Sequence, residues 1–83
     1  MNDDLISQIN VAAYFLAQKR YTYDQLCWML AERQLLVQRD PKYNQDDRIR
    51  EKAAQIFFSG PTYDILCYLI SEIDIMMKLS KKK

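Results

Sequence analysis

The feature that most constrains the fold of this chain is a phrase that occurs twice, forty residues apart. Residues 21–32 read YTYDQLCWMLAE and residues 61–72 read PTYDILCYLISE. The two stretches align without a gap, and a constant offset of this kind is the signature of an internal duplication. The positions of the first copy that are identical in the second are Thr22, Tyr23, Asp24, Leu26, Cys27 and Glu32.

Each copy predicts a helix, a short turn and a second helix. Before the first phrase, apolar residues recur at the i, i+3, i+4, i+7 spacing of one helical face. These residues are Leu5, Ile9, Ala12, Ala13 and Leu16. Thr22 is suited to cap the second helix, with Gln25 at the capping-box position. Asn44 is expected to cap the third helix, and Ser59-Gly60-Pro61 is expected to end it.

We therefore expect an all-α fold, in which two pseudo-twofold-related helical hairpins pack into a compact bundle. The single glycine and two prolines among 83 residues favour long helices with few turns. The expected helices lie near residues 3–19, 22–38, 45–58 and 62–79. The chain would be one domain over 1–83, made of two repeats at about 3–38 and 45–79, with a basic tail at 80–83.

The fourth expected helix is apolar almost throughout, from Ile65 to Leu79. A helix of this kind lies either at the centre of a bundle or against another chain. We expect this helix to lie at the centre of the bundle. The alternative is that it forms the interface of a homodimer.

The composition argues against common catalytic and metal sites. The chain has no histidine, so its two cysteines, Cys27 and Cys67, cannot form a Cys/His zinc site. They are expected to be small buried residues, and a disulfide would require the helices to bring the sulfurs together. No phosphate-binding loop and no nucleophile–base arrangement occurs. We expect no enzyme activity, no metal and no cofactor.

A membrane-spanning segment is not expected. The longest apolar block, Ile65–Ile70, has six residues, whereas a spanning helix needs about 20. We also find no pattern of a secretory leader, and expect a soluble cytoplasmic protein.

The leading functional prediction is a small non-enzymatic protein-interaction module, with a protein partner or self-association as a homodimer. It follows from a surplus of apolar and methionine side chains over what so short a chain can bury. The residues predicted for the partner surface are Trp28, Met29, Leu69 and Met76.

The alternative is a nucleic-acid-binding regulator of the helix-turn-helix type. The net charge of +1 neither demands nor forbids a polyanionic partner. Acidic residues in the second copy, Glu72 and Asp74 among them, disfavour binding by both copies. The predicted contacts are Lys19, Arg20, Arg33, Arg39 and the tail Lys81-Lys82-Lys83.

Three short motifs resemble a family of small bacterial helical domains of unknown function. They are INVAA at 9–13, IREKA at 49–53 and CWMLAE at 27–32. The pattern of that family is I-R-x-x-A, then an aromatic residue, then H-W-L-x-A-E. This chain has Cys27 and Cys67 at the histidine and Tyr68 at the second tryptophan. The resemblance implies a helical fold and adds no chemistry, since that family has no assigned activity.

Overall fold

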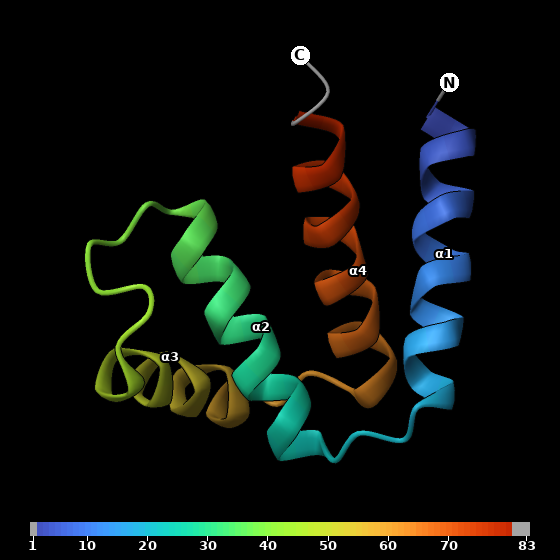
Figure 1. The fold of residues 1–83 in the computed structure, drawn as a ribbon. Coiled ribbons are helices and arrows are strands. Elements are labelled where there is room, and N and C mark those ends of the chain that lie inside the picture. Colours follow the sequence, from blue (N-terminus) through green and yellow to red (C-terminus); the bar gives the residue numbers. More distant parts are fainter. Residues whose placement is uncertain (1, 81–83) are drawn as a thin grey trace.

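The computed structural model describes residues 2–80, and over that range it contains four α-helices and no strand (Figure 1). The helices are α1 (Asn2–Gln18), α2 (Tyr23–Val37), α3 (Asp46–Ser59) and α4 (Tyr63–Ser80). The all-α prediction is confirmed, and each predicted helix boundary lies one residue from the observed one.

Local hydrogen bonds explain why α2 and α4 begin where they do. The Thr22 hydroxyl accepts a hydrogen bond from the Gln25 backbone N–H at 3.1 Å, and the Gln25 side chain accepts one from the Thr22 N–H at 2.8 Å. The Thr62 hydroxyl likewise accepts from the Ile65 N–H at 3.2 Å. Each bond satisfies a backbone donor that the first helical turn leaves free.

Helices α1 and α3 are each followed by a residue in the left-handed conformation. Gly60 follows α3 with a φ of 72°, and Arg20 takes a φ of 59° after α1. The N–H of Gly60 donates to the Phe57 carbonyl at 3.2 Å, and that of Arg20 donates to the Ala17 carbonyl at 3.1 Å. The two helix ends therefore share one geometry, although only one of them uses the glycine that favours it.

The expected cap of α3 by Asn44 is wrong. The helix begins at Asp46 after Gln45, whose side chain makes no capping bond. Two backbone bonds wind the preceding connector into turns: the Tyr43 N–H donates to the Asp40 carbonyl, and the Gln45 N–H donates to the Lys42 carbonyl. These turns place Asn44 one residue before the capping position.

The helices pack in the order α1, α4, α2, α3, so that α4 and α2 are central. In Figure 1, α1 and α4 lie side by side and antiparallel, so that the start of α1 and the end of α4 lie at the same end of the molecule. The preferred central position of the fourth helix is confirmed.

The contacts between helices define which helices pair when the two hairpins pack together. Within residues 2–80, α1 makes no contact with α2, and α3 makes none with α4. Helix α1 packs instead on α4, and α3 packs on α2. Figure 1 shows that α2 leads away from α1 after the short link between them, in which Thr22 has an extended backbone (φ −71°, ψ 162°).

The core lies mainly between α2 and α4. The main cluster of buried residues has ten members, two from α3 and none from α1, whose buried Ile9 lies outside this cluster. They are Leu26, Cys27, Leu30, Ala31, Leu35, Ile49, Ile56, Leu66, Cys67 and Ile70. The buried, half-buried and exposed positions along 21–31 recur in the same order along 61–71, so each repeated phrase occupies the same kind of environment.

Candidate interaction surface

The structure separates the four residues predicted for a partner surface. Trp28, Met29 and Leu69 are partly buried and pack against the core. Met76 is half exposed and lines a pocket of about 380 Å³ between the C-terminal ends of α2 and α4. Of the four residues, Met76 is therefore the one with most of its surface open to a partner.

The basic residues predicted to contact nucleic acid do not gather on one face. Lys19 and Arg20 follow the end of α1, and Arg39 follows the end of α2. These two helix ends lie at opposite ends of the molecule (Figure 1). Arg33 is engaged within the fold, since its Nε lies 2.7 Å from Asp74 Oδ1 and its Nη1 donates to the Met29 carbonyl at 3.0 Å. Lys81-Lys82-Lys83 lie outside the described residues.

The arrangement of α1 and α2 lends no support to the helix-turn-helix alternative. In that motif the two helices joined by the short turn form one compact unit that presents the second helix to the groove. Here α1 and α2 diverge without contact, and the first turn of α2 carries Asp24, which would repel a phosphate.

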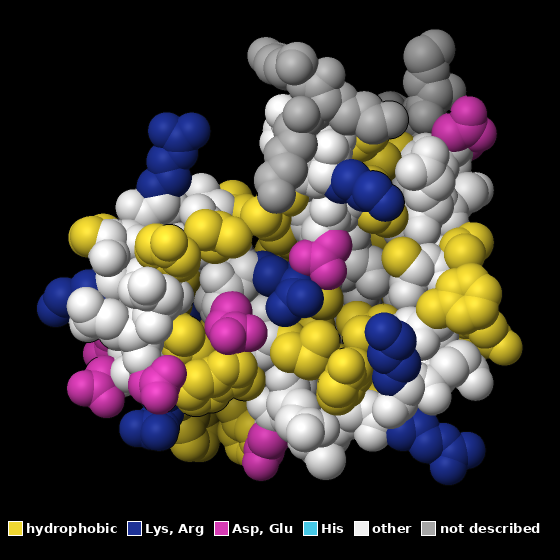
Figure 2. All heavy atoms as spheres, viewed as in Figure 1, with side chains coloured by type: hydrophobic (Ala, Val, Ile, Leu, Met, Phe, Trp, Pro, Cys, Tyr) yellow, Lys and Arg dark blue, Asp and Glu magenta, His cyan; other side chains and the backbone are white. Residues whose placement is uncertain are grey.

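The outer face of α1 carries a group of exposed apolar side chains. Val11, Tyr14 and Phe15 are 55%, 62% and 60% exposed, and the rings of Tyr14 and Phe15 make an edge-to-face contact at 5.6 Å. At 100° per residue, these three residues lie opposite the buried Ile9 and the half-buried Leu16. Figure 2 shows hydrophobic side chains gathered at the edge of the molecule that α1 forms. We call Val11, Tyr14 and Phe15 the α1 outer face.

A second aromatic group lies at the C-terminal end of α3. Phe58 is 84% exposed, while Phe57 contacts both Phe58 and Tyr23 edge to face. Phe57 is thus partly used by the fold, whereas Phe58 is the most exposed large hydrophobic residue. Phe58 therefore serves as an exposed phenylalanine outside the α1 outer face, with which Phe15 can be compared.

Equivalent grooves run along the two outer helix pairs. The groove between α1 and α4 measures about 420 Å³ and includes Ala17, Asp64 and Cys67 in its lining. The groove between α3 and α2 measures about 300 Å³ and has Phe57, Asp24 and Cys27 at the corresponding positions. Because Phe57 is larger than Ala17, the second groove has the smaller volume. The wider groove borders the α1 outer face through Tyr14, which lines it.

The cysteines in these grooves are not suited to nucleophilic chemistry. Both thiols are free and buried. Burial raises the pKa of Cys27, and the carboxylate of Asp24 raises it further; burial and Asp64 do the same to the pKa of Cys67. A thiol with a raised pKa is protonated at neutral pH and reacts slowly. Among residues 2–80, no cluster of three or more Cys, Asp or Glu side chains could hold a metal ion.

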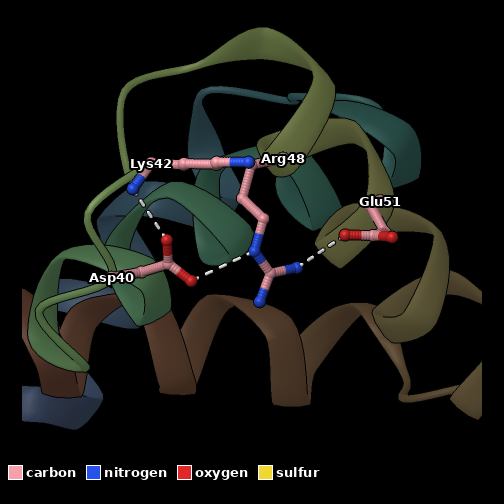
Figure 3. Close-up of polar contacts among 4 residues, drawn as sticks. All are labelled: Asp40, Lys42, Arg48 and Glu51. Atoms are coloured by element: carbon pink, nitrogen blue, oxygen red, sulfur yellow. Dashed lines mark hydrogen bonds and ion pairs between the residues drawn. The ribbon is translucent and has the colours of Figure 1, made fainter.

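The connector between α2 and α3 is held by one acidic residue (Figure 3). Asp40 accepts a hydrogen bond from the Lys42 backbone N–H at 2.8 Å and pairs with Arg48 Nε at 3.1 Å, and Arg48 also pairs with Glu51 at 2.9 Å. The Lys42 N–H, followed by Arg48, holds the pKa of Asp40 below its ordinary value. This network holds the connector between α2 and α3.

No helix in residues 2–80 has the length and apolar character needed to cross a membrane. Comparison of the chain with known protein families, with curated proteins and with solved structures found no match. The resemblance to small bacterial helical domains therefore stays a prediction.

The α1 outer face was missed by reasoning from the sequence, although a signal was present. The apolar spacing of α1 was assigned to one buried stripe, and Val11, Tyr14 and Phe15 fall between the members of that stripe. Apolar residues on both sides of a helix that ends a row of helices indicate a second contact.

Proposed function

We propose that this chain is a non-enzymatic protein-interaction module that pairs with a second copy of itself through the α1 outer face. The observation that carries the proposal is the exposure of Val11, Tyr14 and Phe15 on one side of an outer helix. Large apolar side chains grouped on a surface are typical of protein contact sites, and aromatic residues are enriched at such sites.

The charges on α1 favour a second copy as the partner. Asp3 and Asp4 lie in the first turn of the helix, and Lys19 and Arg20 follow its last turn; all four are exposed. Val11 lies close to midway between the two pairs. If two α1 helices pack antiparallel across a twofold axis near Val11, the acidic end of each meets the basic end of the other. Such self-complementarity is what a twofold interface requires.

A non-enzymatic role is consistent with the groups that the fold presents. The chain has no histidine to serve as a base near neutral pH. The grooves place a protonated thiol beside a carboxylate, which raises the thiol pKa instead of activating the sulfur. These features support binding as the role of the surface.

Light scattering coupled to size-exclusion chromatography tests the proposal over a series of protein concentrations. We expect the wild-type chain to reach the mass of a dimer and Phe15→Ser to remain a monomer with an unchanged helical circular dichroism spectrum. Phe58→Ser is the matched control, because it removes an exposed phenylalanine away from α1. A wild-type monomer at every concentration, or equal loss of the dimer in both variants, would contradict the proposal.

A further inference from the structure

All helix packing in this protein joins one repeat to the other. Within residues 2–80, the contacts are α1 with α4, α2 with α3, and α2 with α4. Each of these pairs has one member before the connector 38–45 and one member after it. Neither half of the chain therefore has a tertiary contact between its own two helices, and each half acts as a binding surface for the other.

The buried residues show the same division. Leu26, Leu30 and Leu35 come from the first half, and Ile49, Leu66 and Ile70 come from the second, yet all belong to one cluster. An isolated half would leave its share of this cluster in water, at a cost that no contact between its own helices offsets.

The surface that joins the halves is self-complementary. The Tyr23 hydroxyl donates to the Pro61 carbonyl, and the Tyr63 hydroxyl donates to the Tyr21 carbonyl. Exchanging each residue for its counterpart forty positions away, Tyr23 for Tyr63 and Pro61 for Tyr21, converts the first bond into the second. The link before α2 and the link before α4 therefore lie beside each other (Figure 1) and are held by reciprocal bonds.

The connector 38–45 is the covalent tie between the halves, and its residues are exposed apart from Asp40. Its course depends on the bonds from Asp40 to Lys42 and Arg48 and on Arg39, which takes a left-handed φ of 59°. This compact path keeps the two halves at a high effective concentration, which favours their pairing within one chain.

We infer that each half can bind the complementary half of a second copy, giving an exchanged dimer whose two lobes each reproduce the contacts of the monomer. The connector decides between the two forms, because no helix contact within a half would be broken or formed by the exchange. Exchange of identical elements through a hinge is a low-cost route to a dimer. The exchange uses the inner surfaces of the halves, so it is independent of pairing through the α1 outer face.

Shortening the connector in the full chain tests this inference. The experiment is performed in the Phe15→Ser background, which removes pairing through the α1 outer face. Deletion of residues 41–44 takes away the turns that return α3 to α2. The expected product has twice the mass by light scattering and an unchanged helical circular dichroism spectrum. A folded monomer, or loss of the helical spectrum, overturns the inference.

A variant in which residues 41–44 are replaced by four glycine and serine residues is the matched control. It keeps the connector length and is expected to remain a monomer. If this control forms the dimer to the same extent as the deletion, shortening is not the cause and the inference is overturned.

Isotope-filtered NMR on a mixture of labelled and unlabelled deletion variant identifies the contacts between chains. Exchange predicts intermolecular contacts between Tyr63 and Tyr21, which lie within one chain in the monomer. A dimer that lacks these intermolecular contacts overturns the inference.

Discussion

Tyr23 and Tyr63 make the same hydrogen bond in opposite directions between the link before α2 and the link before α4. The hydroxyl of each residue donates to the backbone carbonyl that lies two residues before the other tyrosine, Pro61 for Tyr23 and Tyr21 for Tyr63. Each tyrosine thereby ties the start of its own helix to the start of the other central helix. The two bonds connect the halves where the link before α2 and the link before α4 lie beside each other.

Removing either hydroxyl is expected to destabilise the protein. Tyr23→Phe and Tyr63→Phe each leave a half-buried carbonyl without its donor, which costs more than the bond itself contributes. We expect the two variants to lower the urea midpoint by similar amounts, and the double variant to show coupling because both bonds join the same two links. Tyr43→Phe, at an exposed position of the connector between α2 and α3, is the control and should leave the midpoint unchanged. A large effect of one variant beside none of the other would contradict the reciprocal arrangement.

Leu26 and Leu66 occupy equivalent core positions, and both are fully buried. Leu26→Ala or Leu66→Ala is expected to lower the free energy of unfolding by about 2–5 kcal/mol, because each leaves a cavity at the contact between the halves. Leu36→Ala, at an exposed position of α2, should cost less than about 1 kcal/mol. Chemical denaturation followed by circular dichroism provides the measurement. Since the halves share one core, every variant should unfold in a single transition, and separate transitions for the two halves would contradict this.

Substitutions at Gly60 and Arg20 measure how much free energy of unfolding the left-handed residue after α3 and after α1 costs. A Cβ at Gly60 would meet no atom within 4 Å, so the cost of Gly60→Ala comes from the backbone alone. We expect a loss of about 1 kcal/mol in the free energy of unfolding. Arg20→Gly removes the backbone strain of a non-glycine residue in the left-handed conformation. Because glycine also raises the entropy of the unfolded chain, the net stabilisation should be only a few tenths of a kcal/mol. Thermal unfolding of both variants measures the two effects, and a shift of the same sign in both would contradict the assignment.

The lowered pKa of Asp40 predicts that the stability of the fold depends on pH. Its pKa is lowered in the folded state by the Lys42 N–H and then by Arg48. A lowered pKa means that the carboxylate stabilises the fold above the pKa of the unfolded chain, near 4. That stabilisation is lost as the pH falls through the lower folded value. Urea unfolding of the wild type and Asp40→Asn should therefore differ near neutral pH and converge in acid. A difference that stays constant with pH would contradict the role given to the carboxylate.

Local signals in the sequence were enough to place the helices. The hydroxyls of Thr22 and Thr62 and the left-handed Gly60 act within a few residues of where they stand, so the sequence around each of them predicts a boundary. Asn44 failed as a cap because turns in the connector, set by backbone bonds at Asp40 and Lys42, shift the start of α3.

The pairing of the helices could not be predicted in the same way. Apolar spacing shows which side of α1 is buried, but it does not show whether α2 or α4 covers that side. The same limitation affected the predicted partner surface. Trp28, Met29 and Leu69 were assigned to a free face, and the two central helices use them around the core. The α1 outer face became evident only when α1 was found to contact α4 alone.

Charge reversal at the two ends of α1 tests the proposed self-association most directly. One variant carries Asp3→Lys and Asp4→Lys, and the other carries Lys19→Glu and Arg20→Glu. Antiparallel pairing of α1 predicts that each variant alone is a monomer at low salt, because like charges meet at both ends. Mixed together, the two variants should form a dimer, since opposite charges then meet at both ends, and added salt should weaken it.

Light scattering of the two variants and of their equimolar mixture provides the measurement. A dimer in the mixture alone is the predicted result. A mixture that remains monomeric under conditions where the wild type dimerises, or variants that each dimerise as the wild type does, would contradict pairing through the α1 outer face.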